Sequence, residues 1–134
     1  MRHYRAVSLV LMFMFSAVGL IFLVIPDRVL QFFNTLSGWL GFIRAPLGAV
    51  SFYLVLAVGY MYLVSVLAWF MYRFPESRWF PLLLAHAKLA SSGLSLVLFI
   101  AHRPFLIYMT NFIVDGAIGI LALVFYRKIK GLNP

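Results

Sequence analysis

Apolar residues along the chain gather into four long stretches, separated by short segments in which polar and charged residues are concentrated. The stretches cover about residues 6–25, 47–72, 79–101 and 105–126, and each contains at most one charged residue. At about 1.5 Å per residue, each is long enough to cross a hydrocarbon core of about 30 Å as a helix. The pattern therefore predicts an all-α integral membrane protein, a single domain over residues 1–134 with four transmembrane helices in an antiparallel bundle.

The segment 27–43 has a different pattern, in which bulky apolar and polar residues alternate with helical spacing. The apolar face holds Val29, Leu30, Phe33 and Leu36, and the polar face holds Arg28, Gln31 and Asn34 or Thr35. Asp27 is expected to cap this helix, and Ser37-Gly38 to end it. Because Trp39 suits the headgroup region, we predict an interfacial amphipathic segment that acts as a collar between the first two crossings. A lid above a lipid-facing pocket is the alternative.

Two charged residues interrupt the apolar stretches near their centres, Lys88 in the third and Asp115 in the fourth. The turn at 102–104 is so short that the two helices must lie side by side and antiparallel. Lys88 then lies roughly 21 Å from the turn and Asp115 roughly 17 Å, so their depths agree within about one helical turn. A lone charge at the bilayer centre costs about 2.5–3.5 kcal/mol. The spacing therefore predicts that Lys88 and Asp115 form a buried ion pair.

Small and polar residues share a helical face with each of these charges. Lys88 shares its face with Ser91, Ser92 and Ser95, and Asp115 shares its face with Asn111, Gly119 and Ala122. The hydroxyl and amide groups can hydrogen-bond the charged groups, and the small residues allow close approach of the helices. Two interpretations are open. The pair fixes the register of the two helices, or Lys88, Asp115, Asn111, Ser91, Ser92 and Ser95 form a ligand site or proton relay.

The first two apolar stretches contain residues that predict contacts with other helices. Ser16 and Gly19 form a strip of small residues where another helix could approach closely. Tyr53, Tyr60 and Tyr62 lie in the second stretch. Because a buried hydroxyl group needs a hydrogen-bond partner, one of these tyrosines is expected to face the Lys88 region.

His86 lies two residues before Lys88 and points about 160° away from it, on a face that includes Ala90 and Gly93. Polar or small residues on two sides of this helix indicate that protein surrounds it, either its own bundle or a partner chain. His86 is also a candidate axial ligand of a b-type haem. Since His3 and His102 are expected near the membrane surfaces, such a haem would be shared with a partner's histidine.

Composition supports a membrane setting and excludes several classes of chemistry. Hydrophobic residues make up 65% of the chain and charged residues 10%, with a mean hydropathy of +1.04, whereas soluble domains are about one quarter charged. The net charge of +8 falls mainly on segments that flank the apolar stretches, which favours anionic lipid headgroups over nucleic acid. The absence of cysteine excludes disulfides, thiol chemistry, Cys-ligated clusters and lipoprotein anchoring.

Basic residues are distributed unequally between the two ends of the predicted bundle. One end carries seven of them, Arg2, Arg5, Arg73, Arg78, Arg127, Lys128 and Lys130. The other end carries Arg28, Arg44 and Arg103. Because positively charged loops stay in the cytoplasm, we expect both termini there, and the bias suits a bacterial inner membrane.

No catalytic motif is present in the sequence. It contains no phosphate-binding glycine loop, no HExxH and no nucleophile elbow, and its three acidic residues, Asp27, Glu76 and Asp115, are dispersed. We therefore expect no catalytic activity from this chain alone, and predict no metal site and no cofactor of its own.

The layout of four short-looped membrane helices is similar to that of small families such as the DoxX-like proteins, some of which are quinone-linked redox subunits. The similarity concerns architecture and assigns no site residue. Two functions follow from the sequence. The first and preferred one is an accessory or anchor subunit of a larger membrane complex. The alternative is a quinone- or lipid-binding redox or transport subunit that uses Lys88, Asp115 and Asn111.

Overall fold

The computed structural model describes residues 2–47 and 51–130, and within them the chain forms five α-helices and no strand. The helices are α1 (Arg2–Val24), α2 (Pro26–Leu40), α3 (Ser51–Arg73), α4 (Trp79–Ala101) and α5 (Leu106–Lys130). Four of these described helices, α1, α3, α4 and α5, are long and apolar enough to cross a membrane, which indicates an integral membrane protein. The predicted start of the second crossing adjoins residues 48–50, which lie outside the described residues.

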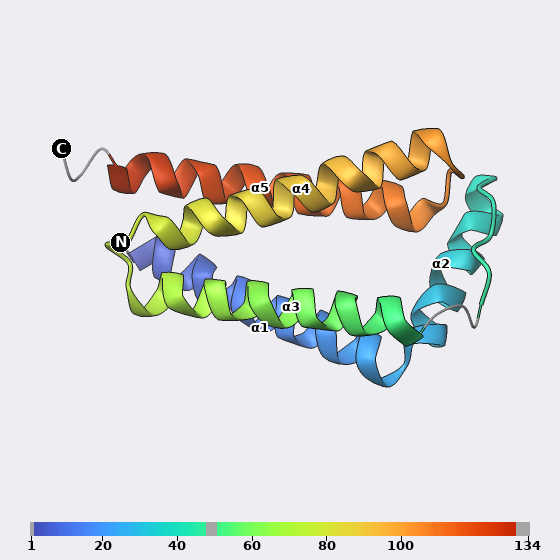
Figure 1. Cartoon of the computed structure of the whole chain (residues 1–134), viewed down its shortest axis with the longest axis horizontal. Coiled ribbons are helices and arrows are strands. Elements are labelled where there is room, and N and C mark those ends of the chain that lie inside the picture. The colour runs from blue at the N-terminus through green and yellow to red at the C-terminus, as the bar shows by residue number, and fades with distance from the viewer. Residues whose placement is uncertain (1, 48–50, 131–134) are drawn as a thin grey trace.

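The four long helices lie in two pairs, α1 with α3 and α4 with α5 (Figure 1). Contacts between α3 and α4 join the pairs. In Figure 1 the pairs lie closest near the two chain ends and diverge toward α2, which lies across the opposite end and contacts both α1 and α5. Lys88 of α4 lies between the pairs, where its Nζ atom faces the rings of Phe15 on α1 and Tyr60 on α3.

Small residues allow close approach within each pair. A Cβ atom on Gly119 of α5 would lie 2.7 Å from Cγ of Leu89 and 3.3 Å from its backbone nitrogen on α4. A Cβ atom on Gly19 of α1 would lie 2.9 Å from Cβ of Met61 on α3. All three distances are below ordinary contact, so larger side chains at Gly119 and Gly19 would push the paired helices apart. Ser16, which the sequence groups with Gly19, is exposed.

The buried apolar core is small for a chain of this composition. Its buried members are Tyr4, Leu11, Phe15, Val64, Ala68, Met71, Leu84, Ala85, Ile118, Ala122 and Ile129. The rings of Tyr4 and Phe125 meet edge to face at 5.0 Å and join α1 to α5. Many large apolar residues lie outside this core, such as Val10, which is 65% exposed, and Ile100, which is 75% exposed. Such surface is stable where hydrocarbon chains surround it.

The ends of α2 differ from those predicted. Ile25 is its N-cap, and Asp27 lies in the first turn without capping the helix, because a proline occupies the first helical position. In that turn the carboxylate of Asp27 interacts favourably with the helix dipole. Ser37 and Gly38 remain helical, and the helix ends at Gly41, whose φ of 75° is the left-handed conformation that glycine adopts readily.

Two of the long helices extend beyond the predicted stretches. α1 begins at Arg2 rather than near residue 6, and α5 continues to Lys130 rather than ending near residue 126. The added turns contain the polar residues that flank each apolar stretch. Apolar length predicts the part of a helix within hydrocarbon, whereas backbone hydrogen bonds continue into the flanking residues.

Candidate functional site

Lys88 of α4 and Asp115 of α5 meet between the two helix pairs. Nζ of Lys88 donates a hydrogen bond to Oδ1 of Asp115 at 2.8 Å. The two side chains are only 2% and 6% exposed. The structure thus brings together the two charges that the sequence places at similar depth, and each one neutralises the other away from water.

Two aromatic rings from the other helix pair contact the ammonium group. Nζ of Lys88 lies 4.4 Å from the ring centroid of Phe15 on α1 and 5.0 Å from that of Tyr60 on α3. Both distances suit cation–π attraction. The hydroxyl group of Tyr60 donates to the carbonyl oxygen of Ala87 at 3.1 Å. Lys88, which belongs to α4, therefore contacts a side chain from each of the other three long helices.

Tyr60 is the tyrosine of α3 that faces the Lys88 region, whereas Tyr53 and Tyr62 are 66% and 73% exposed. The sequence anticipated one such tyrosine without identifying it. Phe15 was missed, because nothing in the sequence distinguishes it among the 14 phenylalanines of the chain.

The amide and hydroxyl groups beside the ion pair bond to partners across the α4–α5 interface. Nδ2 of Asn111 donates to Oγ of Ser95 at 2.7 Å and to Oγ of Ser91 at 3.1 Å. Oγ of Ser92 donates to the carbonyl oxygen of Phe112 at 2.8 Å. These bonds connect α4 to α5 along their polar faces. In the described residues, the expected hydrogen bonds of these groups are directed across the helix interface, and the bond of Lys88 is to Asp115.

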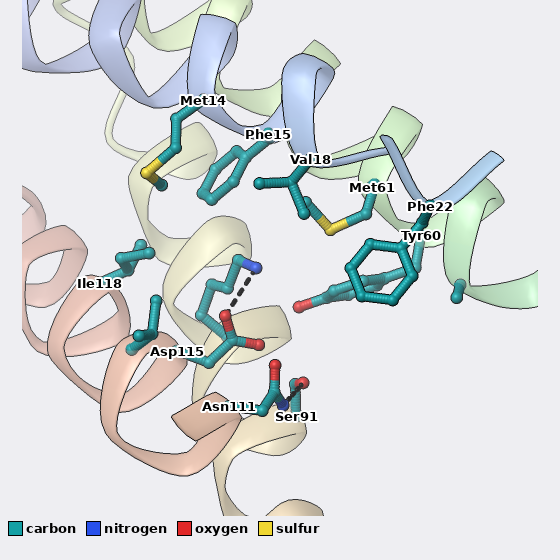
Figure 2. Close-up of a pocket in the computed structure, with 13 residues that line it drawn as sticks. Met14, Phe15, Val18, Phe22, Tyr60, Met61, Ser91, Asn111, Asp115 and Ile118 are labelled. Carbon is teal, nitrogen blue, oxygen red and sulfur yellow. Dashed lines mark hydrogen bonds and ion pairs between the residues drawn. The ribbon is translucent and has the colours of Figure 1, made fainter. Parts of the chain in front are cut away.

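A cavity of about 310 Å³ lies beside the ion pair, and we call it the central cavity (Figure 2). Its apolar walls are formed by Met14, Phe15, Val18, Phe22, Ala57, Met61, Val114 and Ile118, and its polar groups belong to Tyr60, Lys88, Ser91, Asn111 and Asp115. Figure 2 shows Asp115 and Asn111 reaching from α5, and Tyr60 from α3, toward the same space. A largely apolar pocket with a few convergent polar groups is typical of a small-molecule site.

His86 lies away from the central cavity. It is exposed on α4, as are Ala90 and Gly93, and a Cβ atom on Gly93 would meet nothing within 4 Å. The protein's own bundle therefore does not cover this face, which corrects one of the two expected arrangements. The helical spacing predicts that His86 and Lys88 lie on opposite faces of the helix, but it does not indicate which of these faces the other helices cover. His3 and His102 are also exposed.

The central cavity combines hydrogen-bond donors, acceptors and apolar walls at mid-helix depth. Lys88 donates hydrogen bonds and Asp115 accepts them. The side-chain oxygen of Asn111 is a further acceptor, since its N–H donors are directed to Ser91 and Ser95. Comparisons with protein-family models, with curated proteins and with solved structures found no match to this chain. We therefore infer function from the geometry of the site.

Proposed function

We propose that this chain is a small membrane protein that binds an amphiphilic molecule of the quinone or lipid class in the central cavity. The observation that supports this most directly is that a buried ion pair lines an otherwise apolar cavity of about 310 Å³. An ion pair that serves register alone would be enclosed by packed side chains. Ionisable groups that face a cavity at membrane depth are commonly functional.

The hydrogen-bonding groups of the cavity match a carbonyl group and a hydroxyl group on one ligand. The Lys88 ammonium has three N–H donors, and its one hydrogen bond in the described structure is to Asp115. Lys88 can therefore donate to a quinone or ester carbonyl, and Asp115 can accept from a quinol hydroxyl. The apolar tail would lie against Val18 and Ala57. The same pair supplies a proton donor and a proton acceptor, as a redox or transport subunit requires.

We place this site in an antiparallel four-helix bundle of a bacterial inner membrane, with both termini in the cytoplasm. The excess of basic residues at the end formed by the termini and the α3–α4 loop supports this orientation. On α2, Val29 and Phe33 are partly buried while Arg28 and Gln31 are exposed, which supports an interfacial amphipathic helix on the opposite surface.

Filling the cavity tests this function without disturbing the ion pair. Ala57 is exposed but lines the central cavity, so Ala57→Phe adds a ring at the cavity wall. Ala17 is exposed on α1, so Ala17→Phe adds the same ring outside the cavity. Each protein is purified in mild detergent, and its bound molecules are extracted and identified by mass spectrometry. Binding of added decylubiquinone is then measured.

We expect the unmodified protein and Ala17→Phe to hold about one amphiphile per chain, and Ala57→Phe to bind roughly tenfold or more weakly. The reason is that the introduced ring occupies volume that the ligand needs. Equal binding by the two variants would refute the assignment of the ligand to this cavity. An unmodified protein that holds no amphiphile and does not bind decylubiquinone would refute the function.

A second function, as an accessory or anchor subunit of a larger membrane complex, is supported by the exposed face of α4. His86 lies there beside Ala90 and Gly93. An imidazole that faces hydrocarbon lacks hydrogen-bond partners, whereas a partner helix packed on these small residues would supply one. A haem shared with a partner's histidine would use the same face.

Purification in mild detergent separates these two functions. An accessory subunit copurifies with larger chains in fixed stoichiometry, and a shared haem adds its absorption bands to the spectrum of the eluate. His86→Ala should then release the partner. A chain that is isolated alone, and binds its ligand fully in that state, would contradict the accessory role.

A further inference from the structure

A second cavity, of about 670 Å³, lies between α2 and the segment 41–47, and we call it the α2 cavity. Its polar groups come from Gln31, Asn34, Thr35 and Arg44. Its residues belong to other elements than those of the central cavity, so it is a separate site.

The main chain beside Arg44 is held by a two-point hydrogen-bonded clamp. Nδ2 of Asn34 donates to the carbonyl oxygen of Ala45 at 2.9 Å, and the backbone N–H of Ala45 donates to Oδ1 of Asn34 at 2.7 Å. The side-chain amide of Asn34 thereby satisfies both the N–H and the carbonyl group of Ala45, as the backbone of a neighbouring β-strand would. The clamp fixes where the side chain of Arg44 begins.

The guanidinium group of Arg44 lies against the backbone of α2. Its Nη2 atom is 2.8 Å from the point that a Cβ atom on Gly38 would occupy, so the absence of a side chain at Gly38 makes room for it. Among the described residues Arg44 forms no ion pair. Arg44 is exposed, and its planar fork of N–H donors lines the α2 cavity without an anionic partner among the described residues.

We propose that the α2 cavity binds a phosphate group, with Arg44 as a bidentate donor and Gln31 as a neutral donor beside it. Arginine matches phosphate in planar two-point geometry, which makes this the anion class that the fork recognises best. The source favoured by the fold is a phospholipid headgroup. α2 directly follows the end of a membrane-length helix, and Trp39, which also lines the cavity, is 80% exposed and suits a bilayer surface.

The test uses delipidated protein in detergent, titrated with phosphatidylglycerol and followed by native mass spectrometry. Diacylglycerol with the same chains lacks the phosphate group and reports tail binding alone. The variants are Arg44→Gln and Arg28→Gln. Both residues are exposed, but Arg44 lines the α2 cavity and Arg28 does not. We expect Arg44→Gln to weaken phosphatidylglycerol binding roughly tenfold and Arg28→Gln to leave it unchanged.

A second variant keeps the charge and changes only its position. Gly38→Ala places a methyl group where Arg44 now lies, so the guanidinium must move and phosphatidylglycerol binding should fall severalfold. Circular dichroism checks that helix content is preserved in every variant. Equal losses in Arg44→Gln and Arg28→Gln would overturn the proposal, as would diacylglycerol binding as tight as that of phosphatidylglycerol.

Inorganic phosphate distinguishes the two sources of the group. A headgroup site binds phosphatidylglycerol in an Arg44-dependent manner, and millimolar inorganic phosphate displaces it poorly. If inorganic phosphate binds in an Arg44-dependent manner and phosphatidylglycerol does not, the phosphate site is supported and its ligand is the soluble ion. Binding of neither probe overturns the proposal.

Discussion

Replacing Asp115 by asparagine should lower the free energy of unfolding by about 3–5 kcal/mol, because Lys88 would keep its charge without a carboxylate partner. At 2.8 Å and an effective dielectric constant of about 20, the attraction between the two charges is about 6 kcal/mol before desolvation is subtracted. The rings of Phe15 and Tyr60 remain next to the ammonium group, but a cation–π contact contributes only about 0.5–2 kcal/mol.

The double variant isolates the contribution of the pair. Lys88→Met alone leaves Asp115 buried without a cation and should cost about as much as Asp115→Asn. Lys88→Met with Asp115→Asn removes both charges and nearly preserves shape, so it should be more stable than either single variant. The coupling energy of this cycle should be at least about 3 kcal/mol.

The assay is reversible unfolding in mixed detergent micelles, followed by circular dichroism. Ser91→Ala serves as a control on the same face of α4. It removes one of the two hydroxyl groups to which Asn111 donates and should cost only about 0.6 kcal/mol. Single variants that each cost less than about 1 kcal/mol, with additive effects in the double variant, would show that the ion pair does not stabilise the fold.

Three further predictions use the same unfolding assay or hydrogen exchange. Gly119→Ala should destabilise the fold by about 1–3 kcal/mol through contact with α4, whereas Gly93→Ala, in open space, should be neutral or stabilising. Gly41→Ala should cost about 1 kcal/mol because its φ is 75°, and no measurable cost would contradict this explanation. Asn34→Ala should speed hydrogen exchange of the Ala45 amide and leave exchange in α4 unchanged.

The sequence is sufficient to predict the four membrane-length helices, because hydrocarbon thickness sets their length directly. It also predicts that Lys88 and Asp115 meet, for a physical reason. A short turn fixes the depth of both residues, and the cost of burying either charge alone leaves few other arrangements. The remaining tertiary structure lacks such a constraint.

How the two helix pairs pack against each other depends on apolar contacts among many similar side chains. Phe15 and Tyr60 contact Lys88, yet their neighbours on α1 and α3 are chemically equivalent candidates. The central cavity lies where the side chains of the two pairs do not fill the space between them, and no pattern of residues in the sequence predicts it. In α2, the proline at the first helical position sets the start of the helix in place of Asp27. Gly41, which adopts the left-handed conformation, sets its end in place of Ser37-Gly38.

The single hydrogen bond between Lys88 and Asp115 has a consequence for membrane insertion. Lys88 leaves the ribosome before Asp115, so if α4 entered the bilayer alone it would carry a charge that costs about 2.5–3.5 kcal/mol. Only α5 brings the carboxylate that neutralises this charge. α4 and α5 should therefore insert together as one hairpin, and a nascent chain truncated after Ala101 should insert α4 less efficiently than the full chain does.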